Sequence, residues 1–203
     1  MEESPSCCAE TPDLRPLSKA AFSTRSIESG EYETYSDSKA PTPDWVAIFN
    51  LAPDAPLLAE TGGLNAMIVD STALPEQAVT AIVESAFQSA GQRCSALRCL
   101  YLQDDIADGV LTMLKGAMDV LNLGDPWHLN IDSGPVIDAG ARAGILAHID
   151  QARAEGRVLK EMSTPQAGTF VGPTLISVTG IGDLEQEIFG PVLHVARFKS
   201  QDL

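Results

Sequence analysis

The sequence predicts an α/β fold in which a mostly parallel β-sheet is flanked by helices. Short apolar runs alternate with amphipathic segments from residue 57 onward. Their lengths fit βαβ units, in which a helix returns the chain to the next parallel strand. One main domain is expected, because 203 residues with 44% apolar content can bury one sizeable core.

The first strand and helix are predicted between residues 64 and 90. LNAMIVD, residues 64–70, reads as a buried strand, and Pro75 suits a first helical turn. The polar residues between them are candidates for the helix cap: Asp70, Ser71 and Thr72. Apolar residues then recur at helical spacing: Val79, Ile82, Val83, Ala86, Phe87 and Ala90. Gly91 is expected to end the helix.

The remaining elements follow in the same alternation. LRCLYLQ, residues 97–103, predicts a strand, and the apolar spacing over 106–121 predicts a second helix. A third helix is expected at about 139–155, followed by apolar runs at 170–178 and 191–198. The intervening GDPWHLNIDSGPVID is interpreted as a surface connection in which Trp127 packs locally.

The N-terminal part differs in composition. Residues 1–43 are dense in Ser, Pro, Glu and Thr, so burial would not offset the entropy of ordering them, and a disordered leader is predicted. Residues 44–56 form a junction that contains DWVAIFNL, a possible strand or turn. The folded domain is therefore placed at residues 57–203.

Charge and cysteine usage exclude several classes of function. A net charge of −15 disfavours binding to nucleic acid or anionic lipid, since both need clustered Lys and Arg. The acidic N-terminus is not a signal peptide, and no apolar run is long enough to cross a bilayer. Four cysteines without a spaced framework favour a reducing cytoplasm, and their spacing relative to the three His predicts no metal site.

Cys94 is the first candidate for chemistry, in FQSAGQRCSALRC. The residues around it are small enough to let another molecule approach: Gly91, Ser95 and Ala96. Arg93 can favour thiolate over thiol. The alternative is an ordinary buried thiol, since free Cys is commonly buried.

Two acidic segments supply further candidates. Glu60 stands between apolar residues and a Gly-Gly turn, where a carboxylate is costly unless solvated, paired or protonated. Glu187 and Phe189 precede a Gly-Pro turn and could hold a ring-bearing polar ligand by hydrogen bonding and packing. Each of these acids could equally be a solvent-facing loop residue.

Taken together, the three segments resemble the aldehyde dehydrogenase superfamily in motif, order and spacing: ETGG at 60–63, GQRCS at 91–95 and EIFGPV at 187–192. The flanking sequences AETGGLNAMIVDSTALPEQAV and SAFQSAGQRCSALRCLYLQDD look like the C-terminal dehydrogenase module of the proline utilization A flavoenzymes. That module oxidises L-glutamate γ-semialdehyde, the open form of pyrroline-5-carboxylate, to glutamate with NAD.

The resemblance implies a role for each candidate residue. Cys94 would be the nucleophile and Glu60 the general base, while Glu187 would bond the nicotinamide ribose and Phe189 would pack near the nicotinamide. Ser95 matches a position that touches the substrate carboxylate. The thiolate would form a thiohemiacetal with the aldehyde, which passes hydride to NAD and leaves a thioester for hydrolysis.

The sequence also departs from the family pattern. A dinucleotide-binding domain precedes ETGG in the family, whereas the residues before it here contain no strand followed by a glycine-rich turn and helix. We therefore expect a truncated catalytic domain with weak or no activity alone. Full-length relatives are expected to be homo-oligomers.

Two other classes remain open from the residues. One is a non-catalytic remnant of such an enzyme. The other is a cysteine hydrolase in which Cys94 is served by one of the three histidines, His128, His148 or His194, although papain-like and caspase-like signatures are absent.

Overall fold

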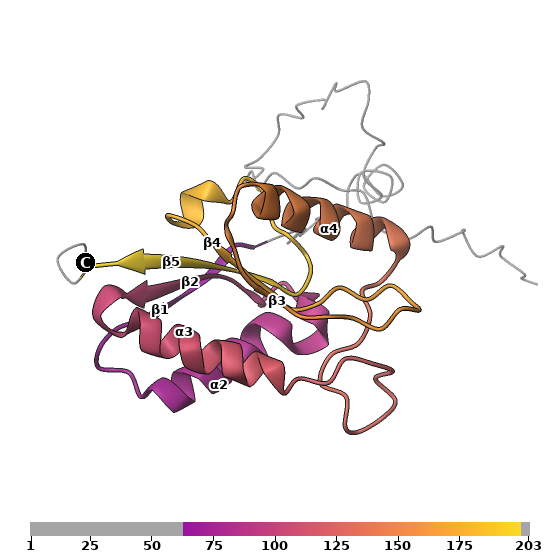
Figure 1. Cartoon of the computed structure of the whole chain (residues 1–203), viewed down its shortest axis with the longest axis horizontal. Helices are drawn as coiled ribbons and strands as arrows, with labels where there is room; N and C mark the ends of the chain where they lie inside the picture. The colour runs from indigo at the N-terminus through magenta and orange to yellow at the C-terminus, as the bar shows by residue number, and fades with distance from the viewer. Residues whose placement is uncertain (1–62, 200–203) are drawn as a thin grey trace, which may run out of the picture. The chain divides into compact units, whose positions relative to one another are not determined.

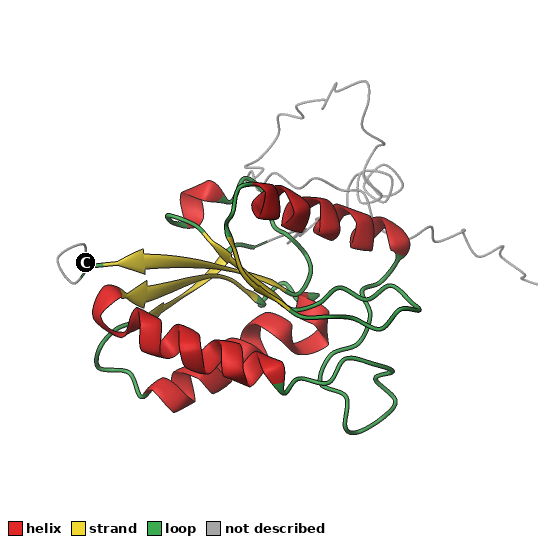
Figure 2. Cartoon of the chain, in the orientation of Figure 1, coloured by secondary structure: helices red, strands yellow, loops and turns green. Residues whose placement is uncertain are grey.

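Five strands form one sheet in the part of the chain that the structure describes. The computed structural model describes residues 63–199. The strands are β1 (Asn65–Val69), β2 (Leu97–Gln103), β3 (Val158–Glu161), β4 (Thr174–Ser177) and β5 (Val192–Phe198). They lie in the order β1-β2-β5-β4-β3, and only β3 within this sheet runs antiparallel to its neighbour. Figure 2 shows the strands in yellow between red helices. The predicted mostly parallel sheet is confirmed, while the predictions for residues 1–43 and 44–56 lie outside the described residues.

Helices cover both faces of this sheet. α2 (Pro75–Phe87) and α3 (Asp104–Asp119) lie on one face, and α4 (Ala139–Ala154) lies on the other (Figure 1). Each face has its own apolar core, one built with α2 and α3 and the second with α4. None of the helices within residues 63–199 is long and apolar enough to cross a membrane.

Helix α2 forms where the apolar spacing predicts it, but its cap differs. The stripe that contains Val79, Ile82 and Phe87 is buried, and Pro75 opens the helix. The residue at the N-cap is Leu74, without a side-chain cap bond, so the predicted cap from Asp70, Ser71 or Thr72 is wrong. Asp70 Oδ1 instead accepts hydrogen bonds from Thr72 N at 2.9 Å and Thr72 Oγ1 at 2.6 Å. The Asp70 carboxylate therefore forms a local Asx turn with Thr72 and is not available to cap α2.

The other elements agree with the pattern apart from their ends, one missed strand and the burial of β1. The sequence predicts β1 as a buried strand, but β1 lies at the edge of the sheet and Ile68 is 58% exposed. α3 begins at Asp104, two residues before the first apolar marker, because two acidic residues suit the positive end of a helix. α4 is capped by Asp138, whose carboxylate accepts from Ala141 N at 2.7 Å. β3 escaped prediction because VLKE is a short, half-buried edge strand with no apolar run.

The connection at residues 124–138 lies on the surface, but Trp127 does not pack locally as expected. Its side chain is 91% exposed. The Asp125 carboxylate accepts from Trp127 N at 3.0 Å, so polar main-chain bonding shapes this turn without an apolar anchor.

Helix α2 ends at Phe87 and not at Gly91 as predicted, because the chain makes a tight left-handed turn at Ser89 and Ala90. A short 3₁₀ segment, Gln88–Gly91, follows α2, and Ser89, Ala90 and Gly91 all have positive φ, of 57°, 52° and 66°. A Cβ built on Gly91 would lie 2.2 Å from the carbonyl oxygen of Gly190. The small size of Gly91 therefore serves close backbone packing against the EIFGPV segment.

Replacing Gly91 by Ala should lower the free energy of unfolding by about 2–4 kcal/mol, because the new methyl meets a backbone carbonyl at a positive φ. Gly109→Ala is the matched control, since a Cβ there meets nothing within 4 Å in helix α3. That change should raise stability by about 0.5–1 kcal/mol. Urea unfolding of both variants checks this, and equal stability of the two would contradict the close packing of Gly91 on Gly190.

Candidate active site

The three predicted motifs converge because they precede three adjacent parallel strands. Gly63 lies just before β1, Cys94 just before β2 and Glu187 just before β5. β2 pairs in parallel with both β1 and β5, so the amino ends of these strands lie at one edge of the sheet. The candidate site therefore occupies the amino edge, opposite to the carboxyl edge at which open α/β sheets usually bind ligands.

Cys94 sits at the top of a four-residue turn. Ala96 N donates to Arg93 O at 3.0 Å and closes the turn, which leaves Cys94 and Ser95 as its central residues. Both are exposed, whereas Ala96 is fully buried. The sulfur of Cys94 is thus held out on a short, hydrogen-bonded turn, which excludes the reading of Cys94 as an ordinary buried thiol.

The ETGG segment reaches this turn through its last glycine and through Asn65. Asn65 Nδ2 donates to Cys94 O at 2.7 Å and to Ala96 O at 3.0 Å, which fastens the turn to β1. A Cβ built on Gly63 would lie 3.3 Å from Cys94 O, so the two backbones are in contact. Glu60 itself, the predicted general base, lies outside the described residues.

Glu187 is held by an arginine that the sequence did not single out. Arg98 donates to Glu187 Oε1 from Nε at 3.0 Å and from Nη2 at 2.8 Å, and Gly63 N donates to Glu187 Oε2 at 2.9 Å. The Arg98 side chain is fully buried and that of Glu187 is 13% exposed. Burial lowers the pKa of the Arg98 guanidinium, while the hydrogen bond and charge of Glu187 act in the opposite direction.

Phe189 is placed by the same guanidinium. Arg98 Cζ lies 5.3 Å from the centre of the Phe189 ring, within the range of a cation–π contact. The ring is 46% exposed, so part of its surface is open to a ligand. Arg98 Nη1 also donates to Gly190 O at 3.1 Å, which fixes the turn that follows Phe189.

Neither Arg93 nor Cys99 takes part in a nucleophilic centre: Arg93 does not bond to the thiol of Cys94, and Cys99 is buried. Arg93 Nη2 donates to Glu84 O at 2.8 Å and to Ser85 O at 3.3 Å, so its hydrogen bonds go to the end of α2 and not to the thiol that it was expected to activate. Cys99 is fully buried, and that burial raises the pKa of its thiol. Of the two described cysteines, Cys94 alone is exposed.

Two of the three histidines bond to each other on the α4 face. His194 Nδ1 lies 3.0 Å from Arg98 O, so in the neutral ring Nδ1 carries the proton and Nε2 is an acceptor. His148 Nε2 lies 2.9 Å from His194 Nε2 and is therefore the donor. The ring nitrogens of His194 are both used in these hydrogen bonds, and His148 bonds to His194 and not to Cys94. This argues against either histidine as the base of a cysteine hydrolase.

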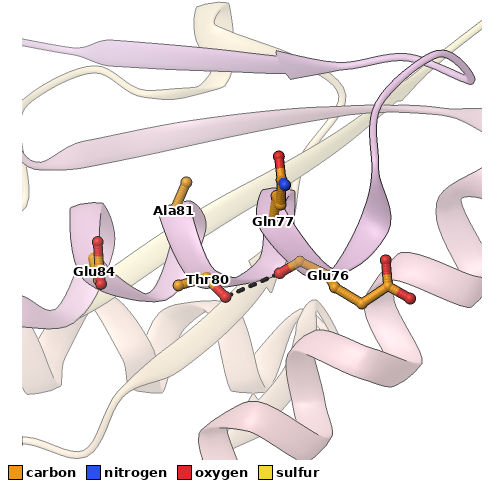
Figure 3. A pocket seen from close by; sticks show the side chains of 5 residues that line it. All are labelled: Glu76, Gln77, Thr80, Ala81 and Glu84. Carbon is orange, nitrogen blue, oxygen red and sulfur yellow. Dashed lines mark hydrogen bonds between the residues drawn. The ribbon is translucent and has the colours of Figure 1, made fainter.

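A shallow surface pocket lies away from the candidate site. It has a volume of about 350 Å³ and is lined along the exposed side of α2 by Glu76, Gln77, Thr80, Ala81 and Glu84 (Figure 3). None of the predicted site residues lines it. Within residues 63–199, no group of three or more His, Cys, Asp or Glu side chains could hold a metal ion.

Asn65 and Arg98 are the site residues that the sequence analysis missed. Both carried a detectable signal, since each is a polar side chain inside a run predicted as a buried strand. A buried amide or guanidinium needs hydrogen-bond partners, so each predicts polar groups facing it. The identity of those partners depends on strand order, which the sequence does not supply.

Comparison with known proteins agrees with the resemblance to aldehyde dehydrogenases. The aldehyde dehydrogenase family model matches residues 49–202. Bifunctional protein PutA of Salmonella typhimurium is 54% identical over 156 residues, which cover 73% of this chain and 12% of the relative. The 1-pyrroline-5-carboxylate dehydrogenase of Geobacillus thermodenitrificans is 36% identical over 149 residues, covering 72% of this chain and 29% of the relative.

Solved structures share the fold. A crystal structure of bifunctional proline utilization A matches with a TM-score of 0.69 and 46% identity, over 75% of this chain and 16% of that chain. Betaine aldehyde dehydrogenase of Staphylococcus aureus in complex with NAD+ matches with a TM-score of 0.64 and 29% identity, over 70% of this chain and 30% of that chain. The chain thus spans about an eighth of the length of its PutA relative, 12%.

The histidine pair predicts a pH dependence of stability. Burial lowers the pKa of His194 to about 4, with nearby His148 and Arg157 acting in the same direction, and burial also lowers the pKa of His148. The unfolded chain therefore binds more protons below about pH 6.5, and stability falls as the pH drops from there towards about 4. His194 contributes at most about 1.4 kcal/mol per pH unit to this fall.

Urea unfolding between pH 7.5 and 4.5 measures the effect. His194→Gln should flatten the fall in stability relative to the unsubstituted chain, and His128→Gln, at an exposed turn residue, should leave it unchanged. Parallel pH profiles for His194→Gln and the unsubstituted chain would show that the pair does not titrate as described.

Proposed function

The chain belongs to the aldehyde dehydrogenase family, and from that premise we propose that it is the nucleophile-bearing segment of an NAD-dependent L-glutamate γ-semialdehyde dehydrogenase. The observation that carries the proposal is the exposed Cys94 turn. Asn65, two residues after ETGG, donates to Cys94 O, and Arg98 bonds both to Arg93 O of the turn and to Glu187 of EIFGPV. The names of the relatives, PutA and 1-pyrroline-5-carboxylate dehydrogenase, supply the substrate class.

Cys94 is proposed to act as the nucleophile. Its thiolate adds to the aldehyde carbon and forms a C–S bond, and the resulting thiohemiacetal is easier to oxidise than the free aldehyde. When bound, NAD supplies the acceptor for the hydride that leaves this carbon. The product on Cys94 is a thioester with glutamate.

Hydrolysis of the thioester is assigned to Glu60. Its carboxylate accepts a proton from water while the water oxygen attacks the acyl carbon, and the C–S bond breaks to release glutamate and restore the thiolate. The contact between Gly63 and Cys94 O supports this role, because Glu60 is only three residues away from Gly63 along the chain.

Two side chains fit contact with the nicotinamide half of NAD. The Phe189 ring is partly exposed and can pack against a flat ring. Glu187 Oε1 accepts two hydrogen bonds, whereas Oε2 accepts only the one from Gly63 N among the described residues. An oxygen of a carboxylate can accept two, so Oε2 keeps room for a ribose hydroxyl.

Ser95 is proposed to contact the substrate, and the cytoplasm is the proposed compartment. The Ser95 hydroxyl is exposed beside Cys94, where it can donate to the carboxylate of the substrate. Both described cysteines are free, which supports a reducing compartment such as the cytoplasm.

A non-catalytic role is the second candidate, because the elements of residues 63–199 include no glycine-rich turn between a strand and an α-helix that could hold the adenosine half of NAD. Calorimetric titration of the chain with NAD separates the two, since saturable tight binding argues against the non-catalytic role.

Cys94→Ser should abolish NAD-dependent oxidation of L-glutamate γ-semialdehyde, because a hydroxyl is not ionised near neutral pH as a thiol can be. Cys99→Ala is the matched control and should retain the rate within about threefold, since the buried Cys99 does no chemistry. The assay follows NADH absorbance with this segment in an intact enzyme that includes the family's dinucleotide-binding domain, because weak or no activity is expected of the chain alone. A Cys94→Ser variant with an undiminished rate would show that the nucleophile is misassigned.

Glu60→Gln should slow hydrolysis more than acylation, because a neutral amide cannot take the proton from water. Rapid mixing should then show one equivalent of NADH formed in a burst, followed by turnover at least about a hundredfold slower. If neither the burst nor steady-state turnover is seen, Glu60 is required for a step before thioester formation, and its assignment as the hydrolytic base is wrong.

A further inference from the structure

We propose that Arg98 is a positioning residue that holds the nicotinamide-contacting segment and the Cys94 turn in fixed register; this inference rests on the proposed function. Arg98 lies in β2, four residues after Cys94, and its side chain is fully buried. None of the three short motifs ETGG, GQRCS and EIFGPV includes it.

Every nitrogen of the guanidinium is used. Nε and Nη2 both donate to Glu187 Oε1, at 3.0 Å and 2.8 Å. Nη1 donates to Gly190 O at 3.1 Å, and Nη2 also donates to Arg93 O at 3.2 Å. Arg93 O is the acceptor that closes the turn bearing Cys94. One group thus touches the nucleophile turn and the segment that bears Glu187 and Phe189.

The contacts on the segment from Glu187 to Gly190 restrain it at three points. The ion pair fixes the carboxylate, the hydrogen bond to the carbonyl fixes Gly190, and Arg98 Cζ lies over the Phe189 ring, 5.3 Å from its centre. A lysine could not replace this arrangement, because a single ammonium nitrogen does not present donors in a rigid planar fork.

The ion pair also decides which oxygen of Glu187 can serve a ligand. Oε1 accepts two hydrogen bonds from Arg98, which use its two lone pairs. Oε2 faces Gly63 N at 2.9 Å and has one acceptor position left. A ribose hydroxyl is therefore expected to reach Oε2, on the side of Gly63, and Arg98 sets that orientation.

Arg98→Lys tests the proposal, with Arg142→Lys as the control. Arg142 also donates from Nε to a main-chain carbonyl, that of Phe170, but lies on α4 outside the site. In Arg98→Lys, exchange of the Gly63 amide proton measured by NMR should speed up at least tenfold, because its acceptor Glu187 is no longer held. Amides of α3 should keep their rates, and the control should change neither.

Turnover provides the second measurement. Arg98→Lys should raise KM for NAD at least tenfold and leave KM for the aldehyde within about threefold. Arg142→Lys should leave both within twofold. A role confined to stability would instead speed exchange across α3 and Gly63 together, with KM for NAD unchanged, and that result would overturn the proposal.

Glu187→Gln covers the case in which Arg98→Lys does not fold. The amide oxygen can still accept from Arg98, while the amide nitrogen then faces Gly63 N and cannot accept from it, so Gly63 exchange should again rise at least tenfold. Gly63 exchange decides the positioning role whether or not the unsubstituted chain shows NAD-dependent turnover, so failure of the proposed function is distinguishable from failure of this inference. Unchanged Gly63 exchange in a folded variant would then refute it.

Discussion

The buried guanidinium of Arg98 is the constraint on which the arrangement of the site depends. A charge with no exposure to water is tolerated only when it is paired and hydrogen bonded, and Arg98 finds its partners in Glu187, Gly190 and Arg93. Removing one partner of such a pair typically costs about 3–5 kcal/mol. The segments before β2 and β5 are therefore held together by a strong requirement for pairing, and the segment before β1 joins them through Gly63 N.

The order of the strands places Arg98 and its partners beside Cys94. Because β1, β2 and β5 are adjacent and parallel, segments far apart in the sequence meet at one edge. Close backbone packing reinforces the meeting, since Gly91 has no room for a side chain against Gly190. The turn that follows leaves Cys94 exposed, while Cys99 in β2 stays in the core. The accessible thiol and the buried one are thus only five residues apart along the chain.

Local patterns in the sequence predict the elements well, for physical reasons. The stripe of Val79, Ile82 and Phe87 is buried by α2 as its spacing requires, and LRCLYLQ forms β2 over the predicted residues. Features that depend on tertiary partners were not predictable. Asp70 bonds within its own turn instead of capping α2, and Trp127 is exposed instead of packing locally.

Some residues of the candidate site were predictable from the sequence and others were not. Residue chemistry and motif resemblance singled out Cys94, Glu187 and Phe189, and the structure brings the segments that carry them to one edge. The role of Arg98 required the order of the strands, because its partner Glu187 is 89 residues away along the chain. A lone cation in an apolar strand predicts some partner, but not which one.

Trapping the acyl group on the chain tests the central claim most directly. The purified chain would be mixed with L-glutamate γ-semialdehyde and NAD, quenched in acid and mapped by peptide mass spectrometry. The account predicts a glutamyl thioester on the peptide that contains Cys94, formed only when NAD is present, with Cys99 unmodified. An adduct on Cys99, or no adduct on Cys94 in a folded chain that consumes NAD, would contradict it.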